Sequence, residues 1–267
     1  MTTWIKSIGL PLIFTLAISG MLILLSGCGK ANDSWEHIQE AGVLRLGVDP
    51  TFPPFAVATD DTVEGIDIDL GRALAAELGL EPQFSHFGYD GLYDALTTGQ
   101  VDVLISALVI APERTKDISY TAPYFDAGLF LFFPADGRIA EDMGDLSGAS
   151  IAVELGSLGH VEALDRQKQV VNLTVLPFEN VAEAMAAAAE GKADAALADY
   201  VSGRLFLRDH PTEELQMTFA PIPDASEPYA LAVRIDDEML LSEINTALAR
   251  LLASGRLEAI IEQHLGP

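Results

Sequence analysis

The sequence predicts an α/β protein built from two similar lobes, each organised around an open, mostly parallel sheet and joined by a hinge. Strand and helix patterns alternate after an apolar leader, which is typical of α/β folds. The order of elements in the first half recurs in the second half, which indicates two related lobes. The amphipathic C-terminal segment needs one of these lobes to pack on.

Residues 1–27 carry a single charge, Lys6, and an apolar run over residues 8–25 that ends at Leu25-Ser26-Gly27-Cys28. Small residues leading into the chain's only cysteine resemble a bacterial lipoprotein signal, so we expect cleavage before Cys28 and a lipid on its sulfur. The plain alternative is a transmembrane anchor, because the run is nearly long enough to span a bilayer. Residues 28–34 then form a lipidated tether. This interpretation places the protein outside the cytoplasm, anchored to the bacterial membrane.

Composition excludes several classes of function. The net charge of −25, which becomes −26 once Lys6 is removed with the leader, disfavours nucleic acid or anionic lipid surfaces as partners. A lone cysteine excludes an intramolecular disulfide, and no Cys/His spacing fits zinc. We therefore expect no metal and no cofactor. About 240 residues remain after the leader, enough for one large domain or two small ones.

The stretch that opens the first lobe pairs a strand with a binding turn. Residues 43–48 alternate between apolar and other side chains, as a half-buried strand does, and Asp49 follows the strand. The proline-rich corner after Asp49 restricts the backbone conformation of Phe52. Asp67 is predicted to cap the next helix, which ends at Gly79. A carboxylate and an aromatic ring are thus fixed at a strand end.

The following elements continue the alternation. We expect strands over 83–87 and 101–106, a helix over 90–98 that stops at Gly99, and an apolar segment over 128–133 that leaves the first lobe.

The second half repeats the first. Residues 98–107 align with 190–199, and residues 46–49 align with 151–154, so that Asp49 and Glu154 end equivalent strands. We expect lobe one to comprise 35–127 and a return segment, 226–267, and lobe two to comprise 128–225. The apolar residues of the return segment recur at helical spacing: Leu240, Leu241, Ile244, Leu248, Leu251, Leu252, Leu257, Ile260 and Ile261.

Open parallel sheets bind ligands beyond the carboxyl ends of their strands. These ends bring Asp49 and the turn over 106–114 from lobe one to face Glu154, the turn over 156–159 and Asp199 from lobe two. Arg114 can grip a carboxylate with a bidentate fork, and Asp199 can accept from an ammonium, so the pair suits a zwitterion. The 156–159 turn offers free N–H groups at a helix start.

At the level of motifs, the chain after Cys28 resembles the bacterial extracellular solute-binding proteins of the polar amino acid type, the capture subunits of ABC importers, which have the two-lobe periplasmic-binding-protein fold. The segments that carry the resemblance, in the order of that family, are GVDPTFPPF (47–55), EGIDIDLGRALAAELG (64–79), YDGLYDALTTGQVDVLISAL (89–108), APERTKDISYTAPYF (111–125), GKADAALAD (191–199) and ALARLLASGRLEAIIEQHLG (247–266).

The resemblance implies roles for individual residues. Arg114 takes the α-carboxylate and Asp199 the α-ammonium, while Asp49 meets the far end of the ligand. The other implied contacts are Phe52 and Tyr89 around the aliphatic body, Ser106 at the backbone groups, and Ser157 and Leu158 at the helix start of lobe two. Val109 departs from the family, which usually has Ser or Thr there to bind the carboxylate. The partners implied are an amino acid and an importer permease, and we expect a monomer.

Charge counting extends this set to Glu154. Once Arg114 and Asp199 neutralise the ligand's backbone charges, Asp49 and Glu154 remain, and two desolvated carboxylates favour a cation between them. We therefore expect a basic amino acid such as lysine, arginine or ornithine. The alternative is a neutral, glutamine-like amino acid, with Glu154 turned toward solvent.

An enzyme on the same fold is the other class to weigh. Cyclohexadienyl dehydratases share the EGIDIDL resemblance but carry a Thr-Asn-Glu acid where this chain has Leu158-Gly159-His160. No nucleophile, metal motif or phosphate loop occurs elsewhere. We therefore expect a binding protein without catalytic residues. A receptor sensor module is disfavoured because no second apolar span precedes Pro267.

Overall fold

The computed structural model describes Met1 and residues 34–59, 62–137, 140, 143–211, 214–218 and 220–266. The predicted leader beyond Met1 and Cys28 lie outside these residues. Within the described residues, no helix is both long enough and apolar enough to cross a bilayer.

The first sheet has the strand order β5-β1-β6-β14-β7, with β8 paired to β14. Its core strand β1 (Val43–Val48) is parallel to both β5 (Glu81–His86) and β6 (Val103–Val109). A strand from much later in the sequence completes the sheet, because β14 (Pro228–Arg234) pairs antiparallel with β6. The short edge strands are β7 (Ile118–Tyr120) and β8 (Phe125–Asp126).

Helices and a small sheet surround this first sheet. The helices are α2 (Ser34–Ala41), α3 (Ile66–Leu78), α4 (Tyr89–Thr97), α8 (Glu238–Ala253) and α9 (Arg256–Leu265), with a 3₁₀ turn at Pro112–Arg114. The small sheet is formed by β2 (Thr51–Phe52), β3 (Ala56–Ala58) and β4 (Val63–Glu64).

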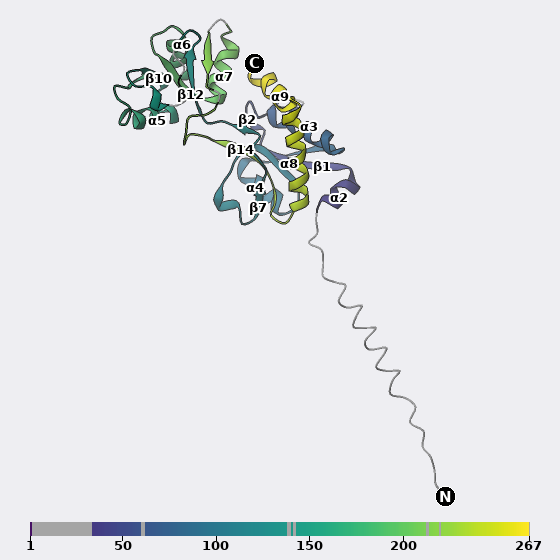
Figure 1. Cartoon of the computed structure of the whole chain (residues 1–267). Coiled ribbons are helices and arrows are strands. Elements are labelled where there is room, and N and C mark those ends of the chain that lie inside the picture. The colour runs from purple at the N-terminus through teal and green to yellow at the C-terminus, as the bar shows by residue number, and fades with distance from the viewer. Residues whose placement is uncertain are drawn as a thin grey trace.

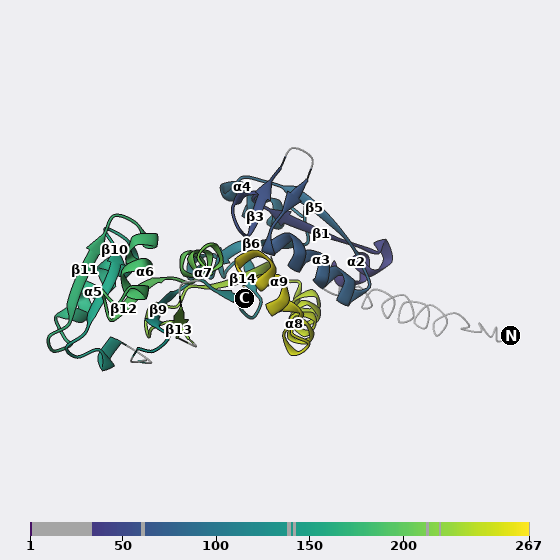
Figure 2. The same cartoon turned by 90° about the horizontal axis from the view of Figure 1, so that it is seen from above.

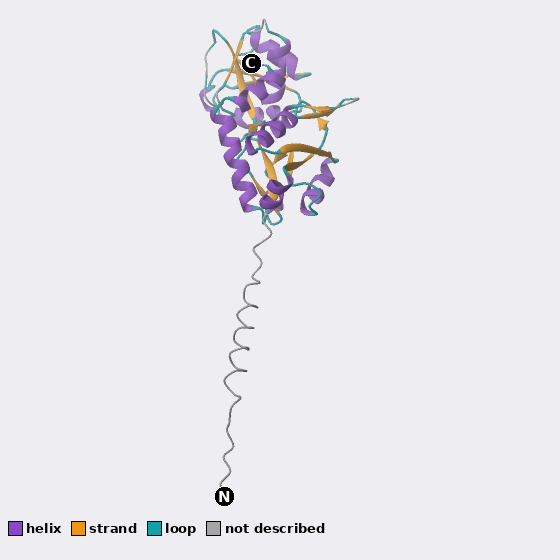
Figure 3. Ribbon diagram, turned by 90° about the vertical axis from the view of Figure 1, so that its right-hand side faces the viewer, coloured by secondary structure: helices purple, strands orange, loops and turns teal. Residues whose placement is uncertain are grey.

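The second sheet has the order β11-β10-β12-β9-β13. Its strands are β9 (Leu129–Pro134), β10 (Ser150–Glu154), β11 (Thr174–Phe178), β12 (Ala195–Asp199) and β13 (Leu215–Met217). Its helices are α5 (Leu158–Gln167), α6 (Val181–Ala189) and α7 (Tyr200–Asp209), and Met143–Asp145 forms a 3₁₀ turn. Figures 1 and 2 show the two sheets with their helices as separate bodies, and Figure 3 shows helices and strands mixed in both.

The internal repeat predicted from the sequence is confirmed in the strand pairing. In the first sheet Leu46 is opposite Val103, and in the second Ile151 is opposite Ala195, as the alignment of the two halves requires. The two aspartates of the repeat also do the same work. Asp102 Oδ2 accepts from the N–H of Arg45 at 3.1 Å, and Asp194 Oδ2 accepts from the N–H of Ser150 at 2.7 Å. Each aspartate thus binds a backbone N–H of the central parallel strand of its sheet.

The hydrophobic core is divided in the same way as the sheets. The C-terminal helices bury Leu240, Ile244, Leu251, Leu257 and Ile261 in one cluster with the strands of the first sheet. Strand β10 separates two further clusters on the faces of the second sheet, with Ile151 and Val153 on one side and Ala152 on the other. The C-terminal helices thus pack against the core of the first sheet, whereas Leu252 is exposed.

Two chain crossings join the bodies, and polar contacts tie them together. Asp126 accepts from the N–H of Gly128 and the N–H of Glu227, both at 2.9 Å, so one carboxylate fastens both crossings. A second contact lies at the end of the chain, where Arg204 donates to the carbonyl of Gly266 and Arg208 donates to that of His264 at 2.9 Å. Figure 1 shows α9 beside α7 at this point.

One local prediction is wrong and another is incomplete. Asp67 does not cap α3, because Gly65 occupies the N-cap position and Asp67 is a fully buried residue of the first turn. The proline-rich corner around Phe52 is not only a bend, since Thr51 and Phe52 pair with β3. Gly79 ends α3 in the left-handed conformation as predicted, with φ 71°.

Candidate functional site

Asp49 and Ser106 lie at the carboxyl ends of neighbouring strands in the first sheet. The Ser106 hydroxyl accepts from the N–H of Asp49 at 3.0 Å, and both residues are buried. The carboxylate of Asp49 turns toward Thr51 and accepts from its N–H at 3.1 Å and its hydroxyl at 2.8 Å, both through Oδ1. These bonds leave Oδ2 without a hydrogen-bond donor among the described residues. The first sheet therefore presents one oriented carboxylate oxygen at this edge.

Aromatic rings and a guanidinium form the rest of this face. Phe52 is 48% exposed and stacks on the buried Phe55, with ring centroids 5.6 Å apart. Tyr89 is 49% exposed and meets the edge of Tyr93 at 6.4 Å. The Arg114 guanidinium lies over the same Tyr93 ring, 3.8 Å from its centroid. Tyr93 thus links two of the predicted ligand contacts.

Arg114 is held by stacking alone among the described residues. No carboxylate there pairs with it, although the chain has 40 acidic and only 15 basic residues. The N–H groups of its guanidinium therefore remain available, as bidentate binding of a carboxylate requires.

The second sheet carries a cavity of about 140 Å³ at the carboxyl ends of β10 and β12. It is lined by all four residues predicted from lobe two: Glu154, Ser157, Leu158 and Asp199. Ser157 caps α5, its hydroxyl accepting from the N–H of His160 at 3.1 Å, and Asp199 caps α7, its Oδ1 accepting from the N–H of Ser202 at 2.9 Å. The strands and helix starts of the repeat thus bring these side chains together.

Glu227 is a lining residue that the sequence reasoning missed. It lies in the return crossing, next to Tyr229, and lines the cavity with Glu154 and Asp199. Burial, and then the charges of Glu227 and Asp199, raise the pKa of the Tyr229 hydroxyl. A hinge residue carries no periodic signal, and only its place at the predicted boundary between 225 and 226 could have drawn attention to it.

The electrostatics of the cavity are one-sided. Three carboxylates line it, and no Lys, Arg or His is among its lining residues. Among the described residues, none of the three makes an ion pair, and only the carboxylate of Asp199 accepts a hydrogen bond, from the backbone N–H of Ser202. Such a site is complementary to a cation and repels an anion.

The candidates from the two sheets do not share this cavity. Asp49, Phe52, Tyr89, Ser106 and Arg114 are absent from its lining. They belong to the other body, and Figure 2 shows the two bodies side by side with the crossings between them.

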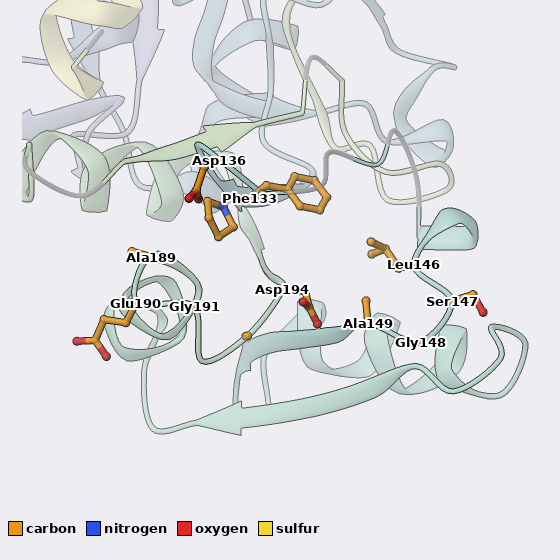
Figure 4. Close-up of a pocket in the computed structure, with 13 residues that line it drawn as sticks. Phe133, Asp136, Leu146, Ser147, Gly148, Ala149, Ala189, Glu190, Gly191 and Asp194 are labelled. Carbon is orange, nitrogen blue, oxygen red and sulfur yellow. The ribbon is translucent and has the colours of Figure 1, made fainter.

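A larger cavity, of about 460 Å³, lies at the opposite edge of the second sheet and is shown in Figure 4. It is lined by residues that precede β10 and β12, including Ser147, Gly148 and Asp194. The Asp194 carboxylate is already engaged by the N–H and hydroxyl of Ser150. None of the predicted site residues lines this cavity, and ligands of open parallel sheets bind at the other edge. We therefore place the candidate site at the carboxyl ends.

Metal chemistry has no visible support in the described part of the chain, where no group of three or more His, Cys, Asp or Glu side chains is arranged to hold an ion.

Comparison with known proteins gives a consistent set of relatives. Residues 44–267 match the family described as bacterial extracellular solute-binding proteins, family 3. ABC transporter arginine-binding protein 1 of Escherichia coli is 28% identical over 224 residues, covering 82% of this chain and 89% of that protein. The glutamine-binding protein GlnH of Bacillus subtilis is 28% identical over 271 residues, covering 94% and 96%.

Solved structures share the fold. An ancestral cationic amino acid solute-binding protein has a TM-score of 0.59 at 29% identity, covering 86% of this chain and 98% of its own. An ancestral cyclohexadienyl dehydratase has a TM-score of 0.75 at 24% identity, covering 90% and 99%, a likeness that concerns the fold alone.

Proposed function

We propose that this chain, which belongs to the bacterial extracellular solute-binding proteins of family 3, captures an amino acid between its two bodies and delivers it to an ABC importer. Matching proteins of Escherichia coli and Bacillus subtilis bear the names of arginine- and glutamine-binding proteins of such transporters. Two observations together carry the proposal: Arg114 on one body has no acidic partner among the described residues, and a cavity on the other body is lined by carboxylates.

We propose a basic amino acid as the preferred ligand. Asp199 accounts for an α-ammonium, which leaves Glu154 and Glu227 at the same cavity and Asp49 on the facing body. A second positive charge on the ligand relieves the repulsion among these carboxylates. Its methylenes fit against Phe52 and Tyr89, and a cation also gains from the ring faces.

A neutral polar amino acid is the second candidate. Its support is the pair of hydrogen bonds from Thr51 to Asp49, which already satisfy one oxygen of that carboxylate and leave the other to accept from an amide. The relative named for glutamine is as similar in sequence as the one named for arginine.

Competition binding decides between these ligands. Arginine and lysine should displace a bound fluorescent or radiolabelled amino acid at lower concentration than glutamine, because Glu154 and Glu227 are neutralised only by a basic side chain. Glu227→Gln should reduce the difference in affinity between arginine and glutamine. A wild-type chain for which glutamine outcompetes both basic amino acids would contradict the preference.

Prephenate or arogenate added to the same samples should yield no product, since Leu158-Gly159-His160 supplies no acid like that of the dehydratases.

We further propose that Arg114 binds the α-carboxylate and Asp199 the α-ammonium. Ser106, Ser157 and Leu158 complete the enclosure of the ligand backbone. The support for Arg114 is its lack of an acidic partner among the described residues, and that for Asp199 is its second oxygen, Oδ2, which its helix cap leaves open.

Arg114→Ala and Asp199→Asn should each weaken binding more than tenfold, since an unpaired ligand charge costs about 2–5 kcal/mol. Asparagine is chosen at 199 because it caps a helix as well as aspartate does, so that stability is preserved. Glu190→Gln, at the opposite edge of the second sheet, is the control for net charge. Calorimetry that finds unchanged Kd in either folded variant would refute the corresponding assignment.

We propose that the two bodies are the lobes 35–127 with 226–267, and 128–225, and that they close around the ligand. The support is that β1, β5, β6, β7, β8 and β14 form one sheet, while strands β9 to β13 form the other. Only two crossings connect the sheets, and Asp126 fastens both, which suits a hinge.

Small-angle scattering of the chain without its leader should show a smaller radius of gyration with saturating ligand than without it, and the mass of a monomer in both. Arg114→Ala at the same ligand concentration is the control and should stay open. An identical radius for the wild type in both states would exclude closure.

We propose that Cys28 carries lipid and anchors the protein on the outer side of the bacterial membrane. The support is the apolar run ending in small residues before Cys28. In cells fed a labelled fatty acid, the wild-type chain should be labelled and found with membranes, whereas Cys28→Ala should carry no label. Labelling of both would locate the lipid elsewhere.

A further inference from the structure

We propose that Asp67 is a positioning residue, whose buried carboxylate holds a bulge in β6 so that Ser106 and Asp49 keep their places at the ligand site. The inference rests on the proposed function, because it concerns the affinity of that same site.

Asp67 is fully buried in the first turn of α3, yet both of its oxygens are used. Oδ2 accepts from the N–H of Ala107 at 2.9 Å, and Oδ1 accepts from the Tyr124 hydroxyl at 2.5 Å. Burial raises the pKa of Asp67 to about 7, against the lowering effect of these two bonds. A polar group this costly to bury indicates a specific task.

The backbone that Asp67 holds is irregular. Strand β14 pairs Ala230 with Leu108 and Ala232 with Leu104, so two steps along β14 match four along β6, and the extra residues of β6 bulge. Within the bulge, Ala107 adopts φ 44°, a left-handed value that is unfavourable for a residue with a Cβ. A bulge removes ladder partners from its own N–H groups, and Asp67 supplies the partner for Ala107.

The bulge sets the direction of the side chain of Ser106, the residue before Ala107. The Ser106 hydroxyl reaches the N–H of Asp49 at 3.0 Å, where the adjacent strand ends. Two proposed ligand contacts are therefore linked through one buried carboxylate. If the bulge relaxed, Ala107 would leave the left-handed region and Ser106 would turn with it.

A purely structural role is the competing explanation, and a set of variants separates the two. Asp67→Leu removes both hydrogen bonds at similar volume. Tyr124→Phe removes the hydrogen bond from the Tyr124 hydroxyl but leaves Asp67 Oδ2 bound to the N–H of Ala107, so it is the matched control. Ala107→Gly tests the backbone directly, because glycine adopts φ 44° without strain. Each variant is measured for thermal stability and for binding of L-arginine, or of L-glutamine if the competition experiment selects it.

Asp67→Leu should lose stability and bind roughly tenfold more weakly, the change expected when one ligand hydrogen bond is no longer made. Tyr124→Phe should lose stability but bind within about twofold of the wild type. Adding Ala107→Gly to Asp67→Leu should restore most of the affinity while the stability stays low. This split between affinity and stability is not expected of a residue that only stabilises the core.

Two results would overturn the inference: unchanged affinity in folded Asp67→Leu, or a loss that Ala107→Gly fails to restore. Asp67→Ala, which also removes both hydrogen bonds, replaces the leucine variant if that variant does not fold, with the same expectations. A wild-type chain that binds neither amino acid would instead overturn the proposed function, and this inference with it.

Discussion

The antiparallel pairing of β14 with β6 is the contact on which the arrangement of this protein depends. It joins Ala230 to Leu108, residues from distant parts of the chain, and so completes the first sheet with a strand that arrives after the second sheet is finished. The same pairing carries the bulge at Ala107 and brings α8 and α9 onto the core of the first sheet. Because the chain must return from the second sheet to the first to form this pairing, it crosses between the sheets twice, and the proposed hinge lies at these crossings.

The repeat gives the two bodies the same framework but different surfaces at their facing edges. At the first sheet, Asp49 is held by Thr51 and accompanied by aromatic rings and Arg114, so the face is amphipathic and contains a cation. At the second sheet, carboxylates and uncharged residues line the cavity, and no basic residue is among them. Under the proposed roles of Arg114 and Asp199, this asymmetry would orient a zwitterion with its carboxylate toward one body and its positive charges toward the other.

Sequence patterns predicted most of what depends on local periodicity. The strands that became β1 and β5, the helix stop at Gly99 and the matched register of the halves all follow from alternation, glycine placement and the repeat. Asp67 was misassigned because an aspartate before an apolar helix looks like a cap, and only the tertiary approach of Ala107 and Tyr124 distinguishes a buried acid from an exposed one. Glu227 was missed because crossings between sheets have no periodicity.

The discontinuous first body has a consequence for the order in which the chain can fold. The strands of the second sheet lie within residues 129–217, so that sheet can be complete before β14, α8 and α9 have been synthesised. The first sheet lacks β14 until Arg234 has been synthesised, and its core lacks α8 and α9 until Leu265 has been synthesised. Pairings this distant in sequence form slowly, because the long loop must close first. A nascent chain of this design therefore keeps its first body incomplete, and its second body able to fold alone, until β14, α8 and α9 have been synthesised.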